Sequence, residues 1–244
     1  MPVSISNYWR ITRAPRYSLT FALPLLVAYE VLAFSLSGAE MTGVRNGADV
    51  LLKSLFLAMG GRDGVVVFGA LLVGGGAWLV WQDYRRWRSL DPRVFGLMAA
   101  ESVVGALAFG MVTSTLTGLL LPGLATILSL GSAGSVSLPA QLMISLGAGI
   151  YEELLFRVIL VSGLAWLARR VLGWSATGSG VFAVIVGAVI FSAFHYIGPY
   201  GDRLELGSFA FRAVAGVLFS GLYLLRGFGI TAWTHALYDV FVVM

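Results

Sequence analysis

Long apolar runs, separated by short polar segments, constrain the fold of this chain more than any other feature. The runs extend approximately over Tyr17–Leu36, Gly64–Trp81, Phe95–Leu121, Pro139–Ala168, Gly178–Ile197, Gly207–Leu225 and Phe228–Met244. A helix needs about 20 residues to cross the hydrocarbon core of a bilayer, where only helices and closed barrels satisfy the backbone hydrogen bonds. The sequence therefore predicts an all-α, polytopic integral membrane helix bundle with about seven (six to eight) transmembrane helices.

The composition agrees with a membrane location and excludes several other classes of protein. Of the 244 residues, 58% are hydrophobic and 11% are charged, whereas a soluble domain carries about 25% charged residues. The net charge is +4, but the basic residues lie in short clusters between apolar runs and not on one soluble face, so no nucleic-acid partner is predicted. The absence of cysteine excludes disulfides, thiolate metal sites and a cysteine nucleophile.

The distribution of basic residues predicts an orientation in the membrane. Loops on the cytoplasmic side carry an excess of Lys and Arg. In an alternating topology, one side collects most of the arginines: Arg10, Arg13, Arg16, Arg85, Arg86, Arg88, Arg93, Arg169, Arg170 and Arg226. We therefore predict a cytoplasmic N-terminus. Two segments fit this scheme poorly: Asp49–Met59 is interpreted as a short stretch on the outer surface, and Pro122–Leu138 as an outer loop or a re-entrant segment.

The fourth run contains a cluster of ionisable residues, Glu152, Glu153 and Arg157. Ionisable groups inside a membrane are costly and mark functional sites by default. On an α-helix, Glu153 and Arg157 are four residues apart and share a face, so they are predicted to pair. Glu152 points about 100° away and has no such partner on its own helix, which suits a general base. A purely structural ion pair is the alternative interpretation of this cluster alone.

Both histidines of the chain lie in later apolar runs. His195 closes the fifth run, and His235 lies in the seventh, four residues before Asp239 and therefore on the same helical face. Asp239 is predicted to orient the His235 imidazole. Taken singly, each histidine is equally well explained as a hydrogen-bond donor between helices. Other ionisable residues in apolar runs, Glu30, Glu101 and Arg212, are interpreted as structural pairs or snorkelling side chains.

Taken together, these three clusters resemble a known signature. The patterns Glu152-Glu153-x-x-x-Arg157, Phe191-x-x-x-His195 and His235-x-x-x-Asp239 are similar to the three motifs of the CAAX protease and bacteriocin-processing (CPBP, or Abi) membrane peptidases. The resemblance covers about residues 139–244. It implies one membrane domain over residues 1–244, with a catalytic core at about 139–244 and supporting N-terminal helices at 1–138.

The resemblance also implies roles for individual residues. Glu152 and His195 would activate a water molecule, His235 and Asp239 would stabilise the oxyanion, and Glu153 and Arg157 would support the site. An ionised Asp239 can only accept hydrogen bonds, so we favour an indirect role for it through His235. The implied protein is an intramembrane endopeptidase of the glutamic type without a cofactor. Its substrate would be a peptide or protein that is lipid-modified or membrane-anchored, as in processing of CAAX proteins, leaders or sorting signals.

Three alternatives stay open at this stage. Zinc held by Glu152, His195 and His235 would make the protein a metalloprotease, although the H-E-x-x-H motif is absent. A non-catalytic immunity or scaffold protein on the same fold is a second, and a proton-coupled transporter is a third, disfavoured because no internal repeat is found. Size and resemblance favour the plasma (inner) membrane of a prokaryote.

Overall fold

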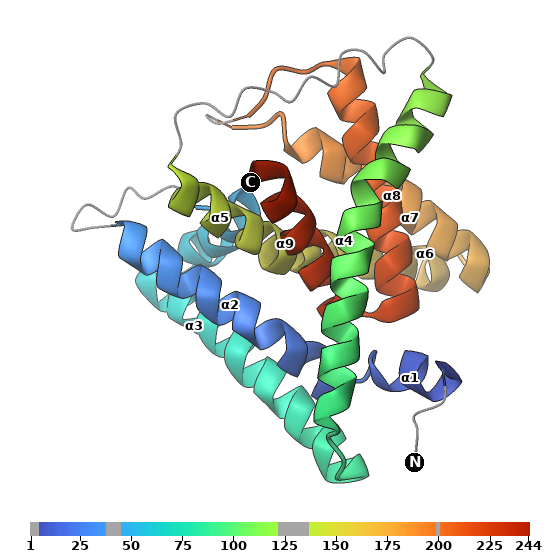
Figure 1. Ribbon diagram of the computed structural model, residues 1–244. Helices are drawn as coiled ribbons and strands as arrows, with labels where there is room; N and C mark the ends of the chain where they lie inside the picture. Colours follow the sequence, from blue (N-terminus) through green and yellow to red (C-terminus); the bar gives the residue numbers. More distant parts are fainter. Residues whose placement is uncertain (1–4, 38–44, 122–136, 199–200) are drawn as a thin grey trace. The chain divides into compact units, whose positions relative to one another are not determined.

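The computed structural model describes residues 5–37, 45–121, 137–198 and 201–244, and these residues form helices connected by short segments, with no strand among them. The elements, labelled in Figure 1, are α1 (Ile5–Ile11), α2 (Pro15–Ser37), α3 (Gly47–Trp87), α4 (Pro92–Leu120), α5 (Leu138–Gly147), the π-helix η1 (Ala148–Val161), α6 (Ser162–Arg170), α7 (Ala176–Phe194), α8 (Leu206–Arg226) and α9 (Phe228–Val243). The predicted all-α, polytopic membrane fold is confirmed.

Among the described residues, five helices are long and apolar enough to cross a membrane: α2, α3, α4, α7 and α8. The two remaining predicted runs correspond to other helical segments. The fourth run is the uninterrupted succession of α5, η1 and α6, and the seventh is the 16-residue helix α9. Most of the predicted outer segment Pro122–Leu138 lies outside the described residues.

Helix α3 is kinked, and the kink separates two segments that the sequence also separated. Gly60 and Gly61 have non-helical backbone angles, and Gly61 adopts φ 60°, ψ −143°. A positive φ favours glycine because it has no Cβ. The kink divides the predicted surface stretch Asp49–Met59 from the apolar run that begins at Gly64.

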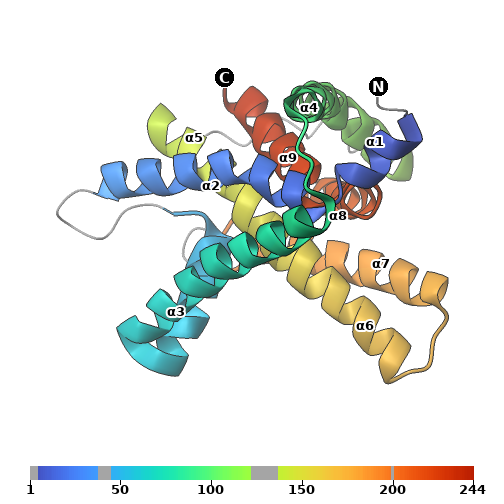
Figure 2. The same cartoon turned by 90° about the horizontal axis from the view of Figure 1, so that it is seen from below.

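The chain forms two compact units. Unit 1 comprises Met1–Ala106, Ser137–Glu153 and Leu225–Met244, and unit 2 comprises Leu107–Val136 and Leu154–Leu224. In unit 1, helices α2, α5 and α9 pack against one another, and α3 runs beside α2, as both views show (Figures 1 and 2). Apolar side chains of α2, α4 and α9 form a core in unit 1 that contains Tyr17, Phe21, Val94, Met98 and Ile230.

An ion pair between Glu101 of α4 and Arg226, the last residue of α8, lies within unit 1. The Arg226 guanidinium contacts both carboxylate oxygens of Glu101, at 2.5 and 2.7 Å, and Tyr8 donates a hydrogen bond to Glu101 at 2.7 Å. Burial and the neighbouring Glu101 raise the pKa of the Tyr8 phenol above its ordinary range. Glu101 therefore has the structural role that was predicted for it.

In unit 2, α6 packs on α7, and a side chain-to-backbone contact joins α7 to α8. Ser192 donates a hydrogen bond to the backbone oxygen of Phe209 at 2.7 Å. Gly216 of α8 lies so close to Ala188 of α7 that an added Cβ would be 2.9 Å from the Ala188 Cα. The predicted structural role of Arg212 agrees with its ion pair to Asp202.

Candidate active site

The predicted site residues are divided between the two units. Unit 1 contains Glu152, Glu153, His235 and Asp239, and unit 2 contains Arg157 and His195. Glu152, Glu153 and Arg157 all lie on η1, which the sequence predicted as an α-helix but which is a π-helix. Its backbone hydrogen bonds span five residues, and such segments are frequent at functional sites. The 3.6-residue period assumed for this segment is therefore wrong.

His235 of α9 is held by a carboxylate of η1. Its Nδ1 lies 2.7 Å from Oε1 of Glu153, which is fully buried. A carboxylate accepts, so Nδ1 is the donor in this contact. Nε2 of His235 is 3.7 Å from Oδ2 of Asp239, too far for a hydrogen bond. Glu153, and not Asp239, makes the hydrogen bond that orients the imidazole.

Close approach of η1 to α9 makes the Glu153–His235 contact geometrically feasible. A Cβ added at Gly149 would lie 2.4 Å from the backbone oxygen of Ala232 and 2.7 Å from Cβ of Ala236. A Cβ atom does not come within 3.0 Å of non-bonded atoms in real proteins, so no side chain fits here without a shift of the helices. Gly149 thus allows the backbone of η1 to contact α9 one turn before His235.

Glu152 has a partner that the sequence analysis missed. Nδ2 of Asn46, at the N-terminus of α3, donates a hydrogen bond to Oε1 of Glu152 at 2.8 Å. Both residues are buried: Asn46 is 2% exposed and Glu152 is 8% exposed. Glu152 also lies close enough to His235 and Asp239 to interact with them electrostatically. A signal for Asn46 exists in the sequence, because Asn followed by a helical segment is typical of an N-cap.

In unit 2, His195 occupies the C-cap of α7, and its ring is fixed by the preceding turn. Nδ1 lies 2.9 Å from the backbone oxygen of Phe191. A carbonyl oxygen only accepts, so Nδ1 is assigned the proton and Nε2 of the neutral ring carries the lone pair. The Phe191 ring packs edge-on against the imidazole, with 4.9 Å between centroids. This tautomer suits an imidazole that accepts a proton through Nε2.

Arg157 is buried in unit 2 between aromatic rings of two helices. Its guanidinium carbon lies 4.4 Å from the ring centroid of Phe191 and 5.3 Å from that of Phe219. Such contacts attract a cation to the negative face of a ring. Phe191 therefore contacts both Arg157 and His195, and links these two predicted site residues within unit 2.

A comparison with protein families now adds to this geometry. Residues 134–241 match the family described as type II CAAX prenyl endopeptidase, Rce1-like. This region of the chain is therefore similar to the Rce1-like family. The matched region contains all six predicted site residues, and the resemblance to CAAX proteases noted in the sequence is confirmed. The protein is an integral membrane protein related to CAAX-type intramembrane proteases. No curated protein and no solved structure shows a match to the chain.

The Rce1-like region supplies two kinds of chemical group that peptide hydrolysis needs. Glu152 is a buried carboxylate with one oxygen held by a donor, and His195 is an imidazole in a fixed tautomer. His235 presents an imidazole whose proton position is set by Glu153. Within neither unit do the described residues include three His, Asp or Glu side chains arranged to hold a metal ion.

Gly149→Ala is expected to separate η1 from α9 and to lower stability by about 1–3 kcal/mol, the usual cost of overpacking. The Glu153–His235 hydrogen bond would lengthen as the helices move apart. Thermal unfolding in detergent measures the loss. Gly69→Ala in α3 is the matched control, since nothing lies within 4 Å of a Cβ there, and alanine favours the helix over glycine. Equal stability of the two variants would contradict the close approach.

Proposed function

We propose that the protein is an intramembrane endopeptidase that hydrolyses a peptide bond in a membrane-associated or lipid-modified protein or peptide. CAAX-type, leader and sorting-signal sequences are the substrate classes to which the family resemblance points. The observation that carries the proposal is the ordered set of motifs within the Rce1-like region. Support also comes from the hydrogen bonds that hold Glu152 and His235 in unit 1.

In the proposed reaction, the carboxylate of Glu152 and Nε2 of His195 both accept hydrogen bonds from one water molecule. The water oxygen attacks the carbonyl carbon of the scissile bond while its proton passes to the carboxylate of Glu152. The resulting oxyanion is stabilised by a hydrogen bond from Nε2–H of His235 in its imidazolium form, since Nδ1 already donates to Glu153. Asp239 acts through its charge near that ring, which favours the imidazolium. The proton then passes from Glu152 to the leaving nitrogen and the C–N bond breaks. The products are a carboxylic acid, which retains the second water proton, and an amine. General acid–base transfer of this kind contributes about 10²- to 10⁴-fold in rate.

Glu153 and Arg157 support the site in this proposal. Glu153 holds Nδ1 of His235, and Arg157 stacks on Phe191 beside His195. We place the protein in the plasma (inner) membrane of a prokaryote because of its size and its family resemblance. The N-terminus is placed in the cytoplasm because the basic segments follow the positive-inside pattern. No cofactor takes part. A zinc-dependent version would use Glu152, His195 and His235 as ligands.

The proposal is tested with the full chain reconstituted in liposomes. We expect cleavage of a quenched fluorescent peptide that ends in a prenylated CAAX sequence, and mass spectrometry would locate the cut. Activity is expected to persist after exhaustive treatment with a chelator. Loss of activity that is restored by zinc alone would contradict the metal-free mechanism. Failure to cleave prenylated, leader and sorting-signal peptides would favour a non-catalytic immunity or scaffold protein.

A further inference from the structure

A buried amide lies against the proposed general base, and it comes from a part of the chain outside the family match. Asn46 donates from Nδ2 to Oε1 of Glu152 at 2.8 Å, although the two residues are 106 positions apart in the sequence. The Rce1-like match begins at residue 134. The N-terminal half of the chain therefore supplies a direct contact to the carboxylate on which the proposed chemistry depends.

The orientation of the Asn46 amide is fixed by a second hydrogen bond. Its Oδ1 accepts from the backbone nitrogen of Ala48 at 2.9 Å, which caps the N-terminus of α3. An amide oxygen accepts and an amide nitrogen donates, so the group cannot be turned around without losing the cap. The amide nitrogen of Asn46 must therefore face Glu152, and Oε1 of Glu152 must be the acceptor.

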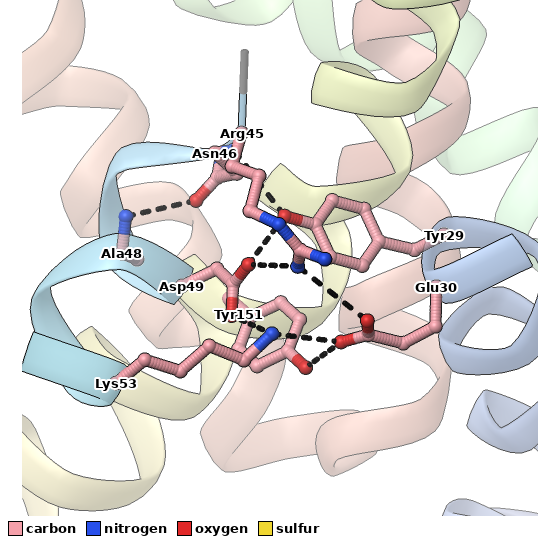
Figure 3. Close-up of polar contacts among 8 residues, drawn as sticks. All are labelled: Tyr29, Glu30, Arg45, Asn46, Ala48, Asp49, Lys53 and Tyr151. Carbon is pink, nitrogen blue, oxygen red and sulfur yellow. Dashed lines mark hydrogen bonds and ion pairs between the residues drawn. The ribbon is translucent and has the colours of Figure 1, made fainter. Parts of the chain in front are cut away.

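A network of charged and phenolic side chains holds the segment that carries Asn46 (Figure 3). Tyr29 of α2 accepts from the backbone nitrogen of Asn46 at 3.3 Å and donates to Asp49 at 2.7 Å. Asp49 also pairs with Arg45 at 2.8 Å and Lys53 at 2.7 Å. Burial alone would lower the pKa of the Arg45 guanidinium, but its hydrogen bond to Asp49 raises that pKa, so Arg45 stays charged.

The same network reaches the residue next to Glu152. Glu30 of α2 accepts from Tyr151 at 2.5 Å and from Lys53 at 3.1 Å. Tyr151 precedes Glu152 on η1, and its ring packs against that of Tyr29 with 5.1 Å between centroids. Figure 3 shows these side chains of α2, α3 and η1 converging around Asp49. Tyr29, which contacts the backbone of Asn46, thus packs against the residue that precedes Glu152.

Close packing leaves the Asn46 side chain little room to move. A Cβ added at Gly147, just before η1, would lie 2.6 Å from Cβ of Asn46 and 2.6 Å from the Tyr29 ring. The backbone of α5 therefore contacts Asn46 directly. Side chains that are packed and bonded in this way keep a reacting group in its productive geometry.

We propose that Asn46 is a positioning residue, which fixes the carboxylate of Glu152 for attack on the scissile bond. This inference rests on the proposed function. The hydrogen bond to Oε1 restricts rotation of the carboxylate, which otherwise turns freely about its terminal torsion. Small displacements of a reacting group reduce rates strongly. Asn46 itself transfers no proton and contacts no substrate in this proposal.

Two substitutions of Asn46 separate positioning from folding. Asn46→Ser keeps an oxygen that caps α3 but loses the donor to Glu152. Asn46→Asp keeps the shape and the cap, and replaces the donor with an acceptor. We expect kcat to fall about 10- to 100-fold for Asn46→Ser, as loss of a hydrogen bond to a charged group implies, with KM unchanged and the thermal unfolding temperature close to wild type. Asn46→Asp should lower kcat at least as much.

A double-mutant cycle provides the decisive measurement. In a Glu152→Gln background, Asn46→Ser should change the residual rate less than twofold, because residues that act as a unit are non-additive. Ser175→Ala is the control for weakening a helix N-cap, since Ser175 caps α7 at 3.1 Å, and it should retain the wild-type kcat. If Glu152→Gln is inactive while Asn46→Ser cleaves at the wild-type rate, the positioning role is wrong and the proposed function stands. If Glu152→Gln cleaves normally, the proposed function fails and this inference fails with it.

Discussion

Glu152→Gln is expected to reduce kcat for peptide cleavage by about 10²- to 10⁴-fold, the contribution of a general base. Glutamine keeps the length and shape of the side chain, and its amide oxygen can still accept from Nδ2 of Asn46. It cannot take a proton from water. The substitution therefore removes the proposed chemistry while the local packing is retained.

The measurement is initial-rate cleavage in liposomes, with folding checked by thermal unfolding in detergent. Glu205→Gln is the matched control. It makes the same chemical change at an exposed residue whose described contacts, with Ser208 and Phe209, use only its backbone oxygen. We expect that variant to cleave at the wild-type rate. Wild-type kcat in correctly folded Glu152→Gln would assign the base to another residue.

The helices were predictable because hydropathy is a local property of the sequence. The run predicted over Gly178–Ile197 matches α7, Ala176–Phe194, to within three residues at each end. The kink in α3 agrees with the break predicted before Gly64, since two adjacent glycines tolerate backbone angles that other residues avoid. The π-helix at η1 was not predictable, because its apolar residues give no pattern that distinguishes a five-residue from a four-residue hydrogen-bond step.

The candidate site was predictable as a set of residues but not as a set of contacts. Motif spacing selected Glu152, Glu153 and His235, because ionisable groups stand out in an apolar run. The hydrogen bond from His235 to Glu153 joins residues 82 positions apart, and only tertiary packing determines it. The spacing of four residues favoured Asp239 as the group that orients His235, yet the 3.7 Å separation places it beyond hydrogen-bond distance.

Asn46 illustrates the same distinction at the other end of the chain. Its sequence context predicts a helix cap, and it is one, accepting from Ala48. Nothing in the neighbouring sequence indicates that the amide nitrogen of Asn46 contacts Glu152. The residues that the family match leaves out therefore contribute to the geometry of the residues that it includes. Sequence motifs identify the proposed chemical groups, whereas the packing of α2 and α3 determines how one of them is held.

Asp49→Ala is expected to be the most destabilising single substitution in the network, at about 3–5 kcal/mol, because it removes the fully buried partner of two ion pairs. Asp49 is fully buried, accepts hydrogen bonds from Tyr29 and Arg45, and forms an ion pair with Lys53. After its removal, Glu30 is the carboxylate of the network that faces both cations. The loss of negative charge in the first turn of α3 also weakens the interaction with the positive end of the helix dipole.

Asp202→Ala is the matched control, since it removes an aspartate from an ion pair at the surface. The Asp202 side chain is 57% exposed and pairs with Arg212, and exposed pairs contribute at most about 1 kcal/mol. Denaturant titration of both variants in mixed micelles, followed by tryptophan fluorescence, gives the two free energies of unfolding. Because the network also anchors Asn46, folded Asp49→Ala protein at low temperature should cleave substrate more slowly than Asp202→Ala. Equal unfolding free energies for the two variants would show that the network does not stabilise the start of α3, and its role in holding Asn46 would then be wrong.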